Sequence, residues 1–190
     1  PESTGPTGSP GPPGQARSVL MVNTFFHHRG GDSSYTFALT DQLQARGHTV
    51  IPFAMQHPRN LPSPYASNFS ASLDYPALAS QSRWQAGRMA LTRGIWNLEA
   101  ADRLDRLLDR VRPDVAHLQH LHHHLTPSVL VPLERRGIPV VWTLHDYELL
   151  CPTGHFFRDG KVCEDCRVFR FDQAIRHRCE RNSRAASLVV

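Results

Sequence analysis

The chain has 190 residues, of which 40% are hydrophobic and 20% are charged. This composition suits one globular domain with a buried core, and it supports no second core. The formal net charge of +4 suits an anionic partner such as a phosphate, but the charge is not concentrated in runs. No stretch reaches the roughly eighteen consecutive apolar residues of a membrane-spanning helix, and the N-terminus has no secretory pattern, so we expect a cytoplasmic protein.

Residues 1–17 form a leader that is rich in Pro, Gly, Ser and Thr. Its glycines recur every third residue from Gly5 to Gly14, but so short a run cannot sustain a collagen triple helix. We expect a disordered leader, followed by a domain over residues 18–190.

Strands and helices alternate after the leader. The apolar residues 19–22 predict a buried strand. A helix follows, because Asp32 or Ser33 can cap its start and Gly47 suits its end. Its expected apolar face comprises Tyr35, Leu39 and Leu43.

The second strand is predicted over residues 49–54, where Pro52 favours a sheet edge or a bulge. Residues 56–82 are rich in Pro, Asn and Ser. A segment of this length without periodicity is uncommon inside a domain unless it binds a ligand or is mobile.

The clearest helix runs from Asn97 to Pro113, with apolar residues at helical spacing. Pairs of opposite charge four residues apart support it, namely Glu99 with Arg103 and Asp102 with Arg106.

Residues 114–118 predict another strand, Thr126 caps a helix that closes at Gly137, and residues 138–144 predict a strongly apolar strand. Because each strand is followed by a crossover, we expect a mostly parallel sheet with flanking helices, an α/β Rossmann-like fold. A helix over residues 171–186 and a strand over residues 187–190 would complete the chain.

Ligands of an open parallel sheet bind beyond the carboxyl ends of its strands. The loops after residues 19–22, 114–118 and 138–144 should therefore face one crevice. The first loop holds Gly30 and Gly31 at a helix start, where backbone N–H groups can approach a phosphate. The pair also fits an ordinary turn, and it is not the full dinucleotide fingerprint.

Histidines fill the second loop, residues 117–124. Pairs such as His117 with His120 could share a metal, but no acidic partner at metal-protease spacing accompanies them, so loop or ligand-contacting roles are preferred. After the third strand, His145 and Asp146 fall in the crevice, although Asp146 could equally cap a turn.

Four cysteines, Cys151, Cys163, Cys166 and Cys179, lie in an insert at about residues 151–179. One C-x2-C pair with two outlying cysteines fits a structural zinc site. The alternative is four reduced thiols, some of which only pack. No thioredoxin-like strand precedes the C-x2-C pair, which disfavours a redox role.

These segments resemble the N-terminal domain of the retaining GT-B glycosyltransferases of family 4. The resemblance spans residues 19–190. It includes Pro113-Asp114-Val115-Ala116-His117, Gly137-Ile138-Pro139-Val140-Val141, and Thr143-Leu144-His145-Asp146-Tyr147 with Leu150-Cys151-Pro152. The last two blocks and their spacing are the most specific.

The resemblance implies an enzyme of two Rossmann-like domains, in which this domain binds a glycan or lipid-linked acceptor and a C-terminal domain holds a UDP- or GDP-sugar. That second domain is expected beyond Val190, so the chain alone should be inactive. Gly30 and Gly31 would contact the donor phosphates, and His145 would lie beside the transferred sugar. His120 and Asp146 are added from their position. The resemblance implies no catalytic metal, and we expect no nucleic-acid partner.

Two other functions remain open. The chain could be a zinc-stabilised α/β binding module without catalytic activity. An epimerase or dehydrogenase ranks last, because the glycine fingerprint is missing. Arg83, Arg88 and Arg93 could favour peripheral contact with an anionic membrane, although a solvated face explains them equally well.

Overall fold

The computed structural model describes residues 15–72, 95–121 and 124–189. The chain forms two compact units, Pro1–Thr143 and Leu144–Val190. Several sequence expectations lie outside the described residues: most of the leader, the end of segment 56–82, the three arginines Arg83, Arg88 and Arg93, and His122 with His123.

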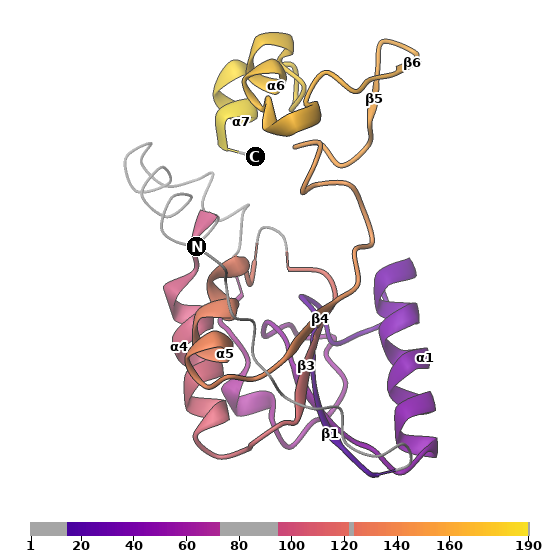
Figure 1. Cartoon of the computed structure of the whole chain (residues 1–190), viewed down its shortest axis with the longest axis vertical. Coiled ribbons are helices and arrows are strands. Elements are labelled where there is room, and N and C mark those ends of the chain that lie inside the picture. Colours follow the sequence, from indigo (N-terminus) through magenta and orange to yellow (C-terminus); the bar gives the residue numbers. More distant parts are fainter. Residues whose placement is uncertain (1–14, 73–94, 122–123, 190) are drawn as a thin grey trace, which may run out of the picture. The chain divides into compact units, whose positions relative to one another are not determined.

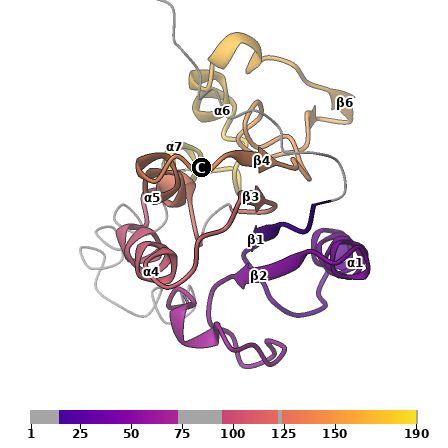
Figure 2. The same ribbon diagram turned by 60° about the horizontal axis from the view of Figure 1, so that its bottom comes forward.

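A four-stranded parallel sheet organises the first unit (Figure 1). Its strands lie in the order β2-β1-β3-β4, with β1 (Ser18–Val22), β2 (Thr49–Phe53), β3 (Val115–Leu118) and β4 (Val140–Trp142). Figure 2 shows α1 (Gly31–Ala45) on one face, and α4 (Leu98–Leu108) and α5 (Leu130–Arg135) on the other. The α/β Rossmann-like fold class is thereby confirmed.

β1 is one of the two inner strands of the sheet, and its apolar side chains lie in the buried core. Leu20 pairs in register with Ile51 on one side and with Ala116 on the other, and all three side chains are buried. Helices cover both faces of the sheet, so an interior strand gains from apolar residues at successive positions. This explains why residues 19–22 are a continuous apolar run.

β2 ends the sheet beside β1, as Pro52 predicted. Proline has no N–H to donate, and at an edge its missing hydrogen bond costs nothing on the open side. β4 is shorter than the strand expected over residues 138–144, and Val140 and Val141 are exposed.

Polar side chains cap α4 and the turn before α5, and the cap at Thr126 was predicted. The Asn97 side chain accepts a hydrogen bond from the Ala100 N–H at 3.1 Å, at the start of α4. Thr126 caps a 3-10 turn, Pro127–Val129, that leads into α5. Gly137 follows α5 with a φ of +63°, the left-handed conformation that favours glycine after a helix.

α1 differs from the expectation in its start and in its buried face. The helix begins at Gly31 with Gly30 as its N-cap residue, so neither Asp32 nor Ser33 holds that position. Tyr35 is 45% exposed, whereas Ser33 and Thr36 are buried. The expected apolar face was therefore wrong at Tyr35, whereas Leu39 and Leu43 are half-buried. The buried Thr36 hydroxyl is satisfied within the helix, because it donates to the Asp32 carbonyl at 2.8 Å.

Arg136 joins the two helices on the same face of the sheet. It pairs with Asp105 and Asp109, which lie at the end of α4. Burial would lower the pKa of Arg136, but hydrogen bonds to the two carboxylates outweigh it and raise that pKa. The guanidinium therefore stays charged and fixes α5 against α4.

The second unit contains short elements: a hairpin of β5 (Phe157–Arg158) and β6 (Lys161–Val162), then α6 (Asp172–His177) and α7 (Arg184–Val189). The single helix expected over residues 171–186 is wrong, because Arg178 takes a left-handed conformation that ends α6.

The strand expected over residues 187–190 is also wrong, since α7 covers most of it. Ser183 explains the helix start: its side chain accepts from the Ala186 N–H at 3.3 Å, and its carbonyl accepts from the Ser187 N–H at 3.0 Å. Among the residues that the structure describes, no helix is long and apolar enough to cross a membrane.

Candidate active site

The loops after β1 and β3 are joined by hydrogen bonds at the carboxyl end of the sheet. The His120 carbonyl accepts from the Thr24 N–H at 2.9 Å and from the Thr24 hydroxyl at 2.8 Å. The His120 N–H donates to the Asn23 side chain at 3.2 Å. Both Asn23 and Thr24 are buried. These contacts confirm that the first two loops meet, as the crevice rule for parallel sheets requires.

A cluster of rings joins the loop between β1 and α1 to the loop after β2. His27 stacks on His57 with ring centroids 4.4 Å apart, and both rings pack edge-on against Phe25. His27 Nδ1 lies 3.3 Å from the Asn60 side-chain oxygen. Asn60 in turn donates to the Met55 carbonyl at 2.8 Å, so the loop after β2 holds the cluster in place.

The cluster is electrostatically positive. The Arg29 guanidinium lies 4.1 Å from the centre of the Phe25 ring, a cation–π contact. Burial lowers the pKa of His57, and the neighbouring positive groups His27, Arg59 and Arg29 lower it further. Two loops therefore bring several cationic groups to the region where α1 begins.

His27 carries the most informative atom of this loop. Its side chain is only 3% exposed, and its Nε2 has no hydrogen-bond partner among the described residues. Buried polar atoms are nearly always hydrogen-bonded, so an unsatisfied one marks a place for a ligand or an ordered water. We did not select His27 or His57 from the sequence. The available signal was the His-His pair just before Gly30.

The two glycines at the start of α1 have different roles. The Gly30 N–H and the Arg29 N–H both donate to the Ser33 hydroxyl oxygen, each at 3.0 Å, which fixes the turn. A side chain on Gly30 would approach the Asp32 carboxylate to 3.2 Å, whereas one on Gly31 would meet no atom within 4 Å. The backbone beside Gly31 therefore faces open space at the positive end of a helix.

The histidines of β3 and of the loop after it make separate contacts. The Nε2 atom of His117, in β3, lies 2.8 Å from the hydroxyl of Thr143, the residue after β4. His124 packs edge-on against Phe25 with centroids 5.7 Å apart. His120 remains in the loop that contacts Asn23 and Thr24. Because His117 is engaged by Thr143, the geometry favours structural and loop roles over a metal shared by His117 and His120.

A cavity of about 290 Å³ lies between α1 and β2. Aromatic and hydroxyl-bearing side chains line it together, including Phe26, Phe53, Tyr65, Thr36 and Thr40. Such a mixture of ring faces and hydroxyl groups suits a ligand that is partly apolar and partly polar.

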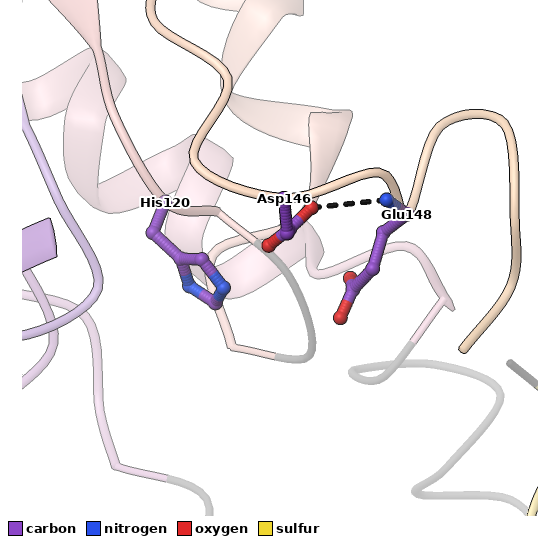
Figure 3. A group of neighbouring side chains, drawn as sticks. All are labelled: His120, Asp146 and Glu148. Atoms are coloured by element: carbon purple, nitrogen blue, oxygen red, sulfur yellow. Dashed lines mark hydrogen bonds between the residues drawn. The ribbon is translucent and has the colours of Figure 1, made fainter. Parts of the chain in front are cut away.

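His145 and Asp146 belong to the second unit. His145 is exposed and Asp146 is half-buried. One carboxylate oxygen of Asp146 accepts from the Glu148 N–H at 3.0 Å (Figure 3). This hydrogen bond closes a tight turn, so the capping role that the sequence left open for Asp146 is present.

The four cysteines line one small cavity within the second unit. Burial raises the pKa of the Cys166 and Cys179 thiols. For Cys151 burial acts in the same direction, but hydrogen bonds from Thr153 and nearby backbone groups outweigh it and lower the pKa. No disulfide joins any of them.

Comparison with known proteins decides the family. A family model described as Glycosyltransferase Family 4 matches residues 29–184, which is most of the chain. The chain belongs to glycosyltransferase family 4. No curated protein and no solved structure matches it.

Family membership confirms the resemblance and agrees with the parallel α/β sheet of the first unit. It makes the chain a glycosyltransferase-type domain in general terms, with a sugar donor and an acceptor as its partners. The matched segment, residues 29–184, contains the start of α1, the loop of His120, the pair His145-Asp146 and all four cysteines.

Proposed function

We propose that this glycosyltransferase family 4 domain is the N-terminal part of an enzyme that transfers a sugar from a UDP- or GDP-sugar to a glycan or lipid-linked acceptor, with retention of the anomeric configuration. One observation carries the proposal. Positive groups from two loops gather where α1 begins, beside a buried histidine nitrogen that lacks a partner. A diphosphate is the part of the donor that such a site would recognise.

The start of α1 is proposed to hold the leaving diphosphate. Gly31 lets backbone N–H groups approach the phosphate closely, and the positive end of the helix dipole favours negative charge there. Arg29 and Arg59 add two guanidinium groups, the side chains best suited to phosphate oxygens. The orphaned His27 Nε2 is proposed to hydrogen-bond a donor oxygen.

These groups would act mainly in the transition state. Negative charge grows on the diphosphate as the bond to the sugar breaks, and an oxocarbenium-like centre forms at the sugar carbon. Dipoles and cations already fixed in place stabilise that charge without reorganising. The chemistry therefore needs no metal ion in this proposal.

His145 is proposed to hydrogen-bond a sugar hydroxyl and to position the ring, with His120 and Asp146 near the substrate. Replacing His145 by Ala should lower the rate of sugar transfer, with donor binding much less affected. An unchanged rate would remove His145 from the mechanism. The anomeric configuration of the product, measured by NMR, tests retention directly.

The cavity between α1 and β2 is proposed to hold part of the acceptor. Thr40 lines it and donates to the Thr36 carbonyl at 2.8 Å, so its side chain is fixed. Thr40→Leu would fill part of the cavity with apolar volume. It should weaken acceptor binding and leave nucleotide binding unchanged.

The diphosphate site is tested by calorimetry of the chain with UDP, GDP and the two parent nucleosides. Losing a hydrogen bond to a charged group costs about 1.5–3 kcal/mol, so Arg29→Ala should weaken UDP or GDP binding by about tenfold to a hundredfold. Arg46→Ala is the matched control, because Arg46 follows the opposite end of α1 and binds Gln42. Equal affinity for nucleoside and diphosphate would contradict the proposal.

A further inference from the structure

The second unit, Leu144–Val190, has almost no apolar core. Of its described residues, only Cys166 and Ala174 are buried hydrophobic ones. Larger apolar side chains are exposed instead, including Phe157 at 60% and Phe169 at 73%. Units below about 70–80 residues rarely gain enough from apolar burial alone and usually need a disulfide or a bound metal. Something other than a core must therefore hold this unit.

Strained backbone conformations in the second unit also require a stabilising constraint. Apart from Thr126, all described non-glycine residues with positive φ lie in this unit. They include Val168 at +57°, which is costly because its side chain is β-branched. Such conformations persist only where the surrounding structure enforces them. A cross-link between separate segments would supply that constraint.

The four cysteines are placed to form the cross-link. Cys151, Cys163, Cys166 and Cys179 come from three separate segments of the unit and line one cavity of about 20 Å³. A space of this size holds about one water molecule or one ion.

Backbone hydrogen bonds fix three of these cysteines. The N–H groups of Cys151, Cys163 and Cys179 donate at 2.8, 2.8 and 3.0 Å to the carbonyls of Tyr147, Phe156 and Ala174. Cys163 directly follows the β5–β6 hairpin, and Cys166 comes three residues later. The hairpin and the turn after it thus form a knuckle that presents two sulfurs to the cavity.

We propose that Cys151, Cys163, Cys166 and Cys179 bind one structural zinc ion that stabilises the second unit. Four thiolates around a tetrahedral zinc leave no open coordination position, which makes the site structural rather than catalytic. Thiolate ligands also select zinc over magnesium or manganese, which prefer oxygen. The site is independent of the proposed sugar transfer.

The surroundings of the cavity suit this ion. Zinc with four thiolates carries a net negative charge, and the Arg158 guanidinium lines the same cavity while donating to Asp165 at 3.0 Å. In the described part of the chain, no three of the four sulfurs lie within 4.8 Å of one another. Binding must therefore draw the sulfurs together, which couples metal binding to folding of the unit.

The first experiment measures metal content. The chain is expressed with zinc in the medium, purified under reducing conditions and analysed by mass spectrometry for metals. We expect about one zinc per chain, and Cys163→Ser or Cys179→Ser should lose it. Asp165→Asn is the control, because its carboxylate lines the same cavity and is not a proposed ligand. The proposal is overturned if the reduced wild-type protein contains no zinc. It is also overturned if Asp165→Asn loses zinc while the cysteine variants retain it.

A cysteine variant could lose zinc because it unfolds, so the ligands are also identified spectroscopically. Cobalt that replaces zinc in the wild-type chain should show the intense charge-transfer absorption of cobalt–thiolate bonds, and its absence overturns the thiolate site. If the metal-free protein has no thiols that react with a thiol reagent, the cysteines form disulfides instead. That result would also overturn the zinc proposal.

The structural role is tested by limited proteolysis of the wild-type chain. Chelation of the metal should increase cleavage within residues 144–190 at least severalfold, with little change within residues 18–72, and added zinc should reverse the effect. Cleavage that does not respond to the chelator removes the structural role.

Discussion

The imidazole rings of His27 and His57 are stacked, with centroids 4.4 Å apart and planes inclined by 24°. One ring is buried after β1 and the other follows β2, so two separate loops meet through this stack. Burial and the neighbouring positive charges lower the pKa of His57. Protonation of His57 therefore makes the stability of these two loops depend on pH.

Stability should depend on the protonation of His57. Burial, followed by the charges of His27, Arg59 and Arg29, lowers its pKa below the ordinary value of 6.5. The unfolded chain then binds this proton more tightly than the folded chain. His57 contributes stability that is present above pH 6.5 and is lost as the pH falls through its lowered pKa.

Replacing His57 by Gln should flatten this pH dependence. Urea unfolding at several pH values between about 5 and 8 measures it, because histidine normally titrates in that range. A slope equal to that of the wild type would contradict the expectation. Addition of UDP should raise the pKa of His57 in NMR titrations, since a bound diphosphate stabilises the charged ring.

Ser33 should be essential for the turn before α1. Its hydroxyl oxygen accepts from two backbone N–H groups, those of Arg29 and Gly30, and the side chain is buried. Ser33→Ala should lower the free energy of unfolding by about 1–3 kcal/mol, because the backbone N–H groups of Arg29 and Gly30 would lose their acceptor. It should also weaken UDP binding, because the loop loses its fixed shape.

Ser34→Ala is the matched control for that change. Ser34 is the next residue of the same helix turn and is exposed. Urea unfolding should give nearly the wild-type free energy for this variant. If the two variants were equally stable, the hydroxyl of Ser33 would not be supporting the turn.

Leu104 should be a main contributor to the core beneath α4. Its side chain is fully buried in the cluster that joins the helix to the sheet. Leu104→Ala should cost about 2–5 kcal/mol, since it removes apolar contacts and leaves a cavity. Leu98→Ala on the same helix should change stability by less than about 0.5 kcal/mol, because Leu98 is 66% exposed. Thermal or urea unfolding compares the two.

Asp146 can be assigned to a capping or a catalytic role by two substitutions. Its carboxylate accepts the Glu148 N–H, and the amide oxygen of Asn can accept the same bond (Figure 3). If Asp146 only caps the turn, Asp146→Asn should keep most of the sugar-transfer rate and Asp146→Ala should lower it. Loss of activity in both variants, with the fold intact, would show that the negative charge itself is needed.

Some parts of this fold follow from local chemistry. The helix α4 begins after Asn97, Thr126 caps the turn that leads into α5, and Gly137 follows α5, as the sequence predicted. Pro52 correctly placed β2 at an edge. A cap or a missing N–H acts within a few residues, so neighbouring sequence is enough to predict it.

The sequence predictions that were wrong concern features that depend on residues far away in the chain. Residues 187–190 are apolar enough for a strand, but a strand exists only where another pairs with it, and Ser183 starts a helix there instead. Tyr35 shares helical spacing with Leu39, yet the sheet covers the face of α1 that carries Thr36. Periodicity shows that a helix exists without showing which side the sheet will bury.

The sequence alone determined the alternation of strands and helices, the glycine turn before α1, the cysteine spacing and the resemblance to family 4, because each depends on residues close together in the chain. Tertiary structure decided the rest. It stacked His27 on His57, left a buried histidine nitrogen without a partner, and gathered four cysteines around one cavity. Such contacts join loops far apart in sequence, and only the pairing and packing of the folded elements bring them together.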